Sequence, residues 1–92
     1  MTDLLTQGLR PSPNATESAV ADETVLLHLV NGTYYGLDAM GTRVWEMLKD
    51  GIDANAICRR IADEFEVELS TVEADVRAFL GALKAQDIVV EG

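Results

Sequence analysis

The sequence predicts one α+β domain in which a three-stranded antiparallel sheet precedes three helices. Two short apolar runs flank Asn31-Gly32, a pair typical of a tight β-hairpin turn. Three later segments repeat apolar residues with helical spacing. The 92 residues are 48% hydrophobic and 25% charged, which suits one globular domain with a modest core.

Residues 1–16 are expected to form a flexible N-terminal tail, and residues 17–92 the folded domain. Both prolines of the chain lie in the first segment, which shows no apolar periodicity. A hairpin alone is only marginally stable, so a further strand is needed. Glu17–Ala21 is expected to supply it, with Asp22-Glu23 as the turn that follows.

The central hairpin is predicted from Val25–Val30 and Thr33–Leu37. A two-residue type I′ turn at Asn31-Gly32 would place Val30 opposite Thr33 and Leu26 opposite Leu37. Both faces of this hairpin carry apolar side chains, so the pattern does not decide which face covers the core.

Two helices are expected next, over residues 39–49 and 54–65. Asp38 and Asp53 are the expected N-caps, because a short acidic side chain accepts the free backbone N–H groups of a first helical turn. Gly51 is the expected stop of the first helix. Apolar residues recur at helical spacing along both segments, so each is expected to bury one face.

A third helix is predicted over residues 71–85, with Ser70 and Glu73 forming a capping box. Asp87–Val90 is expected to be a short strand or a strap over the core. The arrangement of sheet and helices is similar to a winged helix-turn-helix whose wing has moved to the front of the chain.

The chain lacks the parts of a catalytic or metal site, and no enzyme activity, metal or cofactor is expected. It has one histidine and one cysteine. Cys58 lies on the inner stripe of the second helix, where a small core residue is expected rather than a reactive thiol. His28 is expected to face solvent or a neighbouring strand. No calcium-loop or glycine-rich phosphate-loop spacing is present.

The charge balance argues against nucleic acid and membrane partners. Sixteen acidic residues oppose seven basic ones, which gives a net charge of −9. Such a surface repels phosphate backbones and anionic lipids. No apolar stretch reaches the roughly 18 residues of a membrane span, and the first residues do not form a signal-peptide pattern, so a cytoplasmic location is expected.

A β-edge is the feature that points to a binding function. If hairpins order the sheet, Thr33–Leu37 lies at its edge, and this strand contains neither charge nor proline. Edges of this kind accept an added strand, as in domains that bind extended peptides. Two structural alternatives remain: the chain's own third helix or tail covers the edge, or a dimer buries it.

Several stretches resemble a known family: Val25-Leu26-Leu27, Asn31–Asp38, Gly41–Leu48 and Val72–Leu80. Together they are similar to pyrroloquinoline quinone biosynthesis protein D (PqqD) and its relatives, also called RiPP recognition elements. The resemblance covers about residues 22–90. The Tyr-Tyr-Gly-Leu form of the strand is closer to the stand-alone leader-binding proteins of lasso-peptide and radical-enzyme pathways. Asp38 replaces the asparagine frequent in the family, one capping residue for another.

The resemblance implies a peptide chaperone without catalysis of its own. Members hold the leader of a ribosomally synthesised precursor peptide as an added strand between the third strand and the third helix. They present it to a modifying enzyme such as a leader peptidase, a cyclase or a radical SAM enzyme. The expected partners are therefore a precursor peptide and such an enzyme, in RiPP or quinone-cofactor biosynthesis.

The peptide-binding residues implied by the resemblance form two groups. The strand side is Thr33, Tyr34, Tyr35, Gly36 and Leu37, and the helix side is Asp75, Ala78, Phe79 and Ala82. The helix side lies on the shoulder of the third helix where small alanines leave room for a peptide. The sequence leaves open which tyrosine faces the groove, whether the Tyr35 N–H points outward, and whether Phe79 is plain core.

Two other functions remain open from the residues. One is an acidic winged-helix module that binds another protein or dimerises through its free edge. The other is a DNA-binding regulator, which the charge and the few basic residues of the third helix disfavour.

Overall fold

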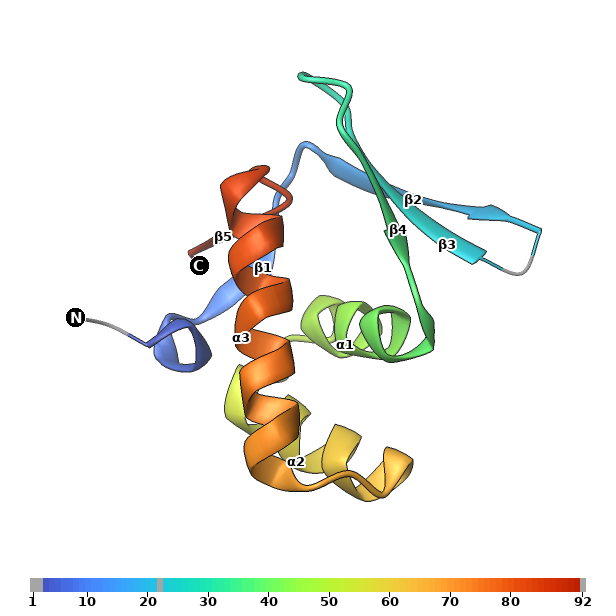
Figure 1. Ribbon diagram of the computed structural model, residues 1–92. Helices are drawn as coiled ribbons and strands as arrows, with labels where there is room; N and C mark the ends of the chain where they lie inside the picture. The colour runs from blue at the N-terminus through green and yellow to red at the C-terminus, as the bar shows by residue number, and fades with distance from the viewer. Residues whose placement is uncertain (1–2, 22, 92) are drawn as a thin grey trace.

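The computed structural model of the chain describes residues 3–21 and 23–91, which form an α+β fold (Figure 1). The strands are β1 (Leu9–Pro11), β2 (Ala15–Val20), β3 (Glu23–His28), β4 (Tyr34–Leu37) and β5 (Val89–Glu91), and the helices are η1 (Leu4–Thr6), α1 (Ala39–Lys49), α2 (Ala54–Phe65) and α3 (Leu69–Ala85). The predicted order, a three-stranded antiparallel sheet followed by three helices, is confirmed. The likeness to a winged helix-turn-helix stays a prediction.

The three-stranded sheet has the order β2-β3-β4, but the β3–β4 register differs from the prediction. Leu26 lies opposite Tyr35, not opposite Leu37. Five residues, Leu29–Thr33, lie between the two strands. The His28 N–H donates to the Thr33 carbonyl, and the His28 carbonyl accepts from the Gly32 N–H. The two-residue type I′ turn is therefore wrong. The shift is two positions, so the side chains that remain in β3 and β4 keep their predicted faces, whereas Leu29 and Val30, predicted as strand residues, lie exposed in the loop.

One face of the hairpin covers the core and the other faces solvent. Leu26, His28 and Leu37 are buried on the inner face, whereas Tyr34 is 72% exposed on the outer one. Tyr35 lies on the inner face and is half-buried. The two neighbouring tyrosines thus point to opposite sides of the sheet, as strand geometry requires.

Regular structure begins well before the predicted domain start at Glu17. The segment expected to be a tail forms η1, β1 and the first residues of β2. Leu5 and Leu9 join the hydrophobic core, and β1 pairs antiparallel with β5. The expectation of a tail without regular structure therefore fails for residues 3–16. No pattern in the sequence indicated this, because Leu5 and Leu9 are single leucines that join the core without a periodic pattern. The strand predicted near Asp87–Val90 is confirmed as β5.

The bounds predicted for α1 and α2 are confirmed, as are their caps. Asp38 Oδ1 accepts the Gly41 N–H at 2.7 Å, and Asp53 Oδ1 accepts the Ala56 N–H at 3.0 Å. Gly51, with a φ of 78°, follows the end of α1 as expected.

Helix α3 begins two residues earlier than predicted, at Leu69. The predicted capping box of Ser70 and Glu73 is wrong, because Ser70 already lies inside the helix. Glu66 ends α2 in the left-handed conformation with a φ of 53° and turns the chain at once. Glu68 is then the N-cap, and its side chain makes no capping hydrogen bond.

The core lies where the three helices meet the inner face of the sheet and the β1–β5 pair. Its fully buried side chains are Leu26, Val44, Met47, Ile57, Cys58, Ile61, Val72, Val76, Leu80, Leu83, Ile88 and Val89. Figure 1 shows α3 running along the molecule, with the three-stranded sheet towards one end and α2 at the other. This arrangement leaves α3 facing β4 across the amino-terminal end of α1.

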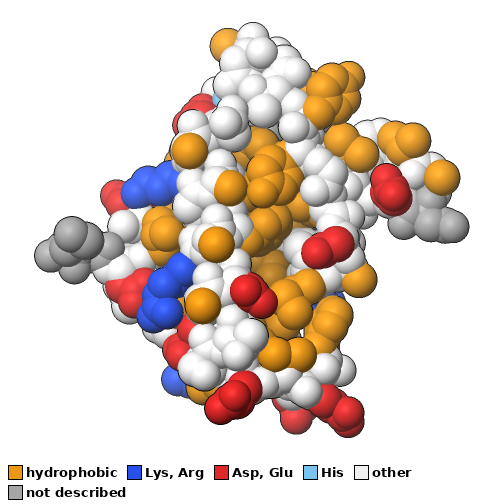
Figure 2. All heavy atoms as spheres, viewed as in Figure 1, with side chains coloured by type: hydrophobic (Ala, Val, Ile, Leu, Met, Phe, Trp, Pro, Cys, Tyr) orange, Lys and Arg blue, Asp and Glu red, His pale blue; other side chains and the backbone are white. Residues whose placement is uncertain are grey.

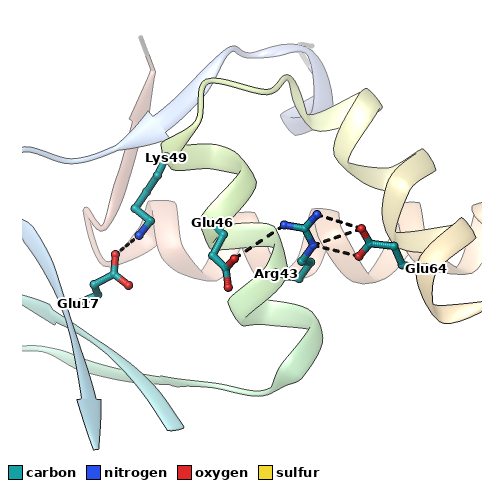
Figure 3. Close-up of polar contacts among 5 residues, drawn as sticks. All are labelled: Glu17, Arg43, Glu46, Lys49 and Glu64. Carbon is teal, nitrogen blue, oxygen red and sulfur yellow. Dashed lines mark hydrogen bonds and ion pairs between the residues drawn. The ribbon is translucent and has the colours of Figure 1, made fainter. Parts of the chain in front are cut away.

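Ion pairs hold α1 on two sides (Figure 3). Lys49 donates to Glu17 of β2, and the Trp45 Nε1–H donates to the same carboxylate at 3.4 Å. Arg43 forms two bonds of 3.0 Å to Glu64 of α2, and its guanidinium lowers the pKa of that carboxyl group. Exposed pairs of this kind add little stability.

Candidate functional site

Strand β4 forms an edge of the three-stranded sheet. It pairs with β3 on one side, and no strand within residues 3–21 or 23–91 pairs with its other side. The His28 N–H donates to the Thr33 carbonyl, and hydrogen-bonded pairs alternate along an antiparallel ladder. The backbone groups of Tyr35 and Leu37 therefore point to β3. Those of Tyr34 and Gly36 point outward.

This alternation determines whether the Tyr35 N–H points outward. Its N–H belongs to the β3–β4 ladder, opposite Leu26, and does not face the free edge. The free edge of β4 thus offers two donors and two acceptors, one of each at Tyr34 and at Gly36. Such unpaired groups are the template on which a further strand can add.

An apolar pocket lies beside the end of β4, between α1 and α3. Its volume is about 160 Å³. Its lining residues come from the start of α1 and the middle of α3: Asp38, Met40, Gly41, Val44, Asp75, Val76 and Phe79. Figure 2 shows hydrophobic side chains gathered in a hollow on this face of the molecule. An engineered apolar cavity of about 150 Å³ accepts benzene, so the pocket has the size of one side chain.

Two aromatic rings span the space between the sheet and α3. Tyr35 of β4 and Phe79 of α3 meet edge to face, with ring centroids 6.1 Å apart and an interplanar angle of 66°. Gly41 lets Phe79 lie close to α1, since a Cβ on Gly41 would be 3.4 Å from the Phe79 ring and 3.1 Å from Asp38 Oδ1. The half-buried Phe79 ring is therefore both core and pocket wall.

The structure separates the predicted strand-side residues. Thr33 precedes β4. The Tyr34 side chain lies exposed on the outer face of the sheet, and Gly36 is also exposed. Tyr35 faces the pocket side against Phe79. Leu37 is buried in the core. A further strand added at this edge would thus contact β4 mainly through the backbone of Tyr34 and Gly36.

The predicted helix-side residues lie on one flank of α3. Asp75 and Phe79 line the pocket, Ala78 is exposed and Ala82 is half-buried. The pocket residues from α1, such as Met40, Gly41 and Val44, were not predicted as site residues. Gly41 could have indicated this part of the pocket from the sequence, because a glycine inside a helical pattern often marks close packing.

The opposite flank of α3 is covered by the chain itself. Arg77 donates two bonds of 3.0 and 2.9 Å to Asp3, and Lys84 donates to Gln7 at 2.8 Å. The N-terminal segment thus occupies the shoulder of α3 that carries Arg77 and Lys84. The shoulder with Asp75 and Phe79 faces the open edge of β4.

Cys58 and His28 are not arranged for catalysis. Cys58 is buried in the core, and burial raises the pKa of its thiol, which keeps the thiol protonated. His28 is 3% exposed and bonds to the loop after β3 and to Asp87. Within the described part of the chain, no cluster of histidine, cysteine and acidic side chains could hold a metal ion. The helices of residues 3–21 and 23–91 are too short or too polar to cross a membrane.

One family model and two solved structures match this chain. The family model described as coenzyme PQQ synthesis protein D (PqqD) matches residues 23–89. The structure "TbiB1 in Complex with the TbiA(beta) Leader Peptide" is 41% identical, with a TM-score of 0.81 over 87% of this chain and 93% of that chain. "Lasso peptide synthetase B1 complexed with the leader peptide" shares the fold, with 24% identity and a TM-score of 0.82 over 90% and 98% of the two chains. A search of the curated proteins gave no match.

Proposed function

Since the chain belongs to the family of coenzyme PQQ synthesis protein D, we propose that it binds the leader segment of a ribosomally synthesised precursor peptide. The observation that carries the proposal is the free β4 edge beside an apolar pocket of one-side-chain size. TbiB1, a relative with 41% identity, is solved in complex with a leader peptide.

The leader would lie as a fourth strand along β4. Its backbone would bond to the outward groups of Tyr34 and Gly36. Guest residues opposite Tyr35 and Leu37 would point to the inner side of the sheet, because side chains across a pair share a face. Two guest side chains spaced by two residues would therefore face α3, and one of them would reach the pocket.

The bound leader would be presented to a modifying enzyme, such as a leader peptidase, a cyclase or a radical SAM enzyme. The module itself would have no catalytic role, in keeping with the buried Cys58 and the bonded His28. Ribosomes make the precursor in the cytoplasm, and we place the encounter there.

Paired substitutions at Gly36 test the added strand. Gly36→Pro deletes one outward N–H, and we expect the Kd for the leader to rise about tenfold, since a lost hydrogen bond and the bulk of the ring both act on the edge. Gly36→Ala keeps the N–H, and its Cβ would meet no atom within 4 Å, so the Kd should stay unchanged. Titration calorimetry measures both, with the TbiA(beta) leader peptide of the TbiB1 complex as the probe.

Changes in the amide chemical shifts of the isotope-labelled chain locate the site at which the leader binds. On addition of the leader, shifts should concentrate at Tyr34–Leu37, at Gly41–Val44 and along Asp75–Ala82. Equal affinities of the proline and alanine variants, or shifts confined to other segments, would refute strand addition at β4.

A further inference from the structure

We infer that strand β2 pairs with the β2 strand of a second copy of this chain and joins the two sheets into one. The pairing is antiparallel, about a two-fold axis at Ser18. It is independent of the proposed leader binding, since β2 and β4 are the opposite edges of the sheet (Figure 1). It follows from the free backbone groups of β2, from its side chains and from the position of its one charge.

Strand β2 has one free side. It pairs with β3, and no strand within residues 3–21 or 23–91 lies on its other side. The Leu29 N–H of the β3 side donates to the Asn14 carbonyl at 2.8 Å, which sets the alternation of the β2–β3 ladder. The backbone groups of Glu17 and Ala19 therefore point away from β3. Residues 16–20 are all exposed, so a second strand can reach these groups.

This edge has few of the features that keep exposed strands apart. Proteins protect such edges with lysine, proline or a bulge. Strand β2 contains neither lysine nor proline, and its six residues pair with β3 without a bulge. Glu17 is its one charged residue, and Lys49 of α1 bonds to that carboxylate. The backbone at this edge is thus open to another strand.

The strand is complementary to itself in one register. A pair centred on Ser18 places Glu17 opposite Ala19 of the second copy, and each such pair exchanges two backbone hydrogen bonds. Thr16 then lies opposite Val20, which is 58% exposed in the single chain. Contacts between β-branched side chains of neighbouring strands stabilise a sheet. A register centred on Glu17 is disfavoured, because two like charges would face each other.

Pairing of two identical edges closes at two copies. Both β2 strands are used, and the two β4 edges stay free at the outer ends of the joined sheet, so each chain can still add a leader strand. Pairing of β2 with β4 of the next copy would instead continue without end. The net charge of −9 on each chain opposes association, and salt screens this repulsion. We therefore expect a weak dimer that salt strengthens.

Disulfide cross-linking tests the register. Ser18→Cys puts a thiol at the axis, where the two Cα atoms of a non-hydrogen-bonded pair lie about 4.5 Å apart, within reach of a disulfide. Thr16→Cys is the matched control on the same exposed face, and its two copies lie about 13 Å apart along the strands. With oxidised glutathione as the oxidant, we expect Ser18→Cys to give about tenfold more covalent dimer than Thr16→Cys. Cys58 is buried and common to both variants.

Sedimentation of the wild-type chain and two variants measures the dimer without a cross-link. Ala19→Pro deletes an outward N–H, and an edge strand accepts proline where the N–H faces solvent. Ala19→Ser keeps this N–H. We expect a dimer Kd on the order of 100 µM for the wild-type chain and for Ala19→Ser, because the contact is small. Ala19→Pro should raise this Kd about tenfold or more, since hydrogen bonds are lost on both sides of the axis.

The outcomes separate this inference from the proposed function. A wild-type chain that stays monomeric up to about 1 mM, or equal cross-linking of Ser18→Cys and Thr16→Cys, would overturn the β2 dimer. Equal dimer Kd values for the two Ala19 variants, or polymers larger than a dimer, would do the same. The TbiA(beta) leader should bind the wild-type chain and Ala19→Pro with the same Kd. Failure of this peptide to bind would count against the proposed function alone.

Discussion

His28 determines how β3 connects to β4. Its Nδ1 accepts the N–H groups of Val30 and Asn31 at 3.1 and 3.2 Å, so the ring hydrogen lies on Nε2 and is donated to Asp87 Oδ2 at 3.0 Å. One side chain thus shapes the loop between β3 and β4 and ties it to the turn that follows α3. The loop leads into β4, whose Tyr35 meets Phe79 of α3.

Replacing this imidazole should destabilise the chain. His28→Leu leaves two backbone donors and the Asp87 carboxylate without their partner, so we expect a loss of about 1–3 kcal/mol in the free energy of unfolding. Asp87→Asn is the control, because asparagine keeps an acceptor and tolerates the left-handed φ of 59° at this position. Urea denaturation measures both variants. A smaller loss for His28→Leu than for Asp87→Asn would contradict this role.

At the scale of elements, the close approach of α1 and α3 depends on Gly41 in the first turn of α1. Glycine weakens a helix by roughly 0.5–1 kcal/mol relative to alanine. Gly41 lowers the stability of α1, but it avoids the close contact that a Cβ would make with the Phe79 ring and with the capping oxygen of Asp38. The position therefore trades helix stability for the shape of the pocket.

Gly41→Ala should separate these two properties. The gain in helix propensity and the shift of Phe79 oppose each other, so we expect the free energy of unfolding to change by less than about 1 kcal/mol. The leader Kd should rise several-fold, since the new methyl group and the displaced ring narrow the pocket. Denaturation and calorimetry on the same variant give both values. An unchanged Kd would show that the guest does not use this wall.

At the scale of the whole molecule, the N-terminal segment is one of the layers around the core. Leu5 of η1 is buried, β1 pairs with β5, and Asp3 bonds to Arg77 of α3. The segment covers one shoulder of α3, which leaves the other shoulder as the side on which a guest strand can lie.

Substitutions in this segment should affect stability through burial more than through charge. Leu5→Ala removes a buried side chain, and we expect it to lower the free energy of unfolding by about 2–4 kcal/mol. Asp3→Asn breaks an exposed pair with Arg77 and should have a much smaller effect. Thermal or urea unfolding compares the two variants. A stability loss for Leu5→Ala no larger than that for Asp3→Asn would argue that the segment is detached in solution.

The sequence by itself determined the features that depend on residues close together in the chain. The caps at Asp38 and Asp53 and the ends of α1 and α2 follow from contacts within one helical turn. The face of each strand side chain follows from the two-residue period, which the register shift did not alter. The order of consecutive hairpins likewise predicted Thr33–Leu37 as an edge strand, and β4 lies at the edge of the sheet.

Only the tertiary structure decided the features that join distant segments. The register of β4 depends on His28, whose bond to Asp87 spans 59 positions. The open flank of α3 depends on Asp3, which bonds 74 positions away to Arg77. The pocket needs α1 and α3 side by side. No local pattern encodes such pairs, because loop closure between them becomes favourable only when the whole core forms.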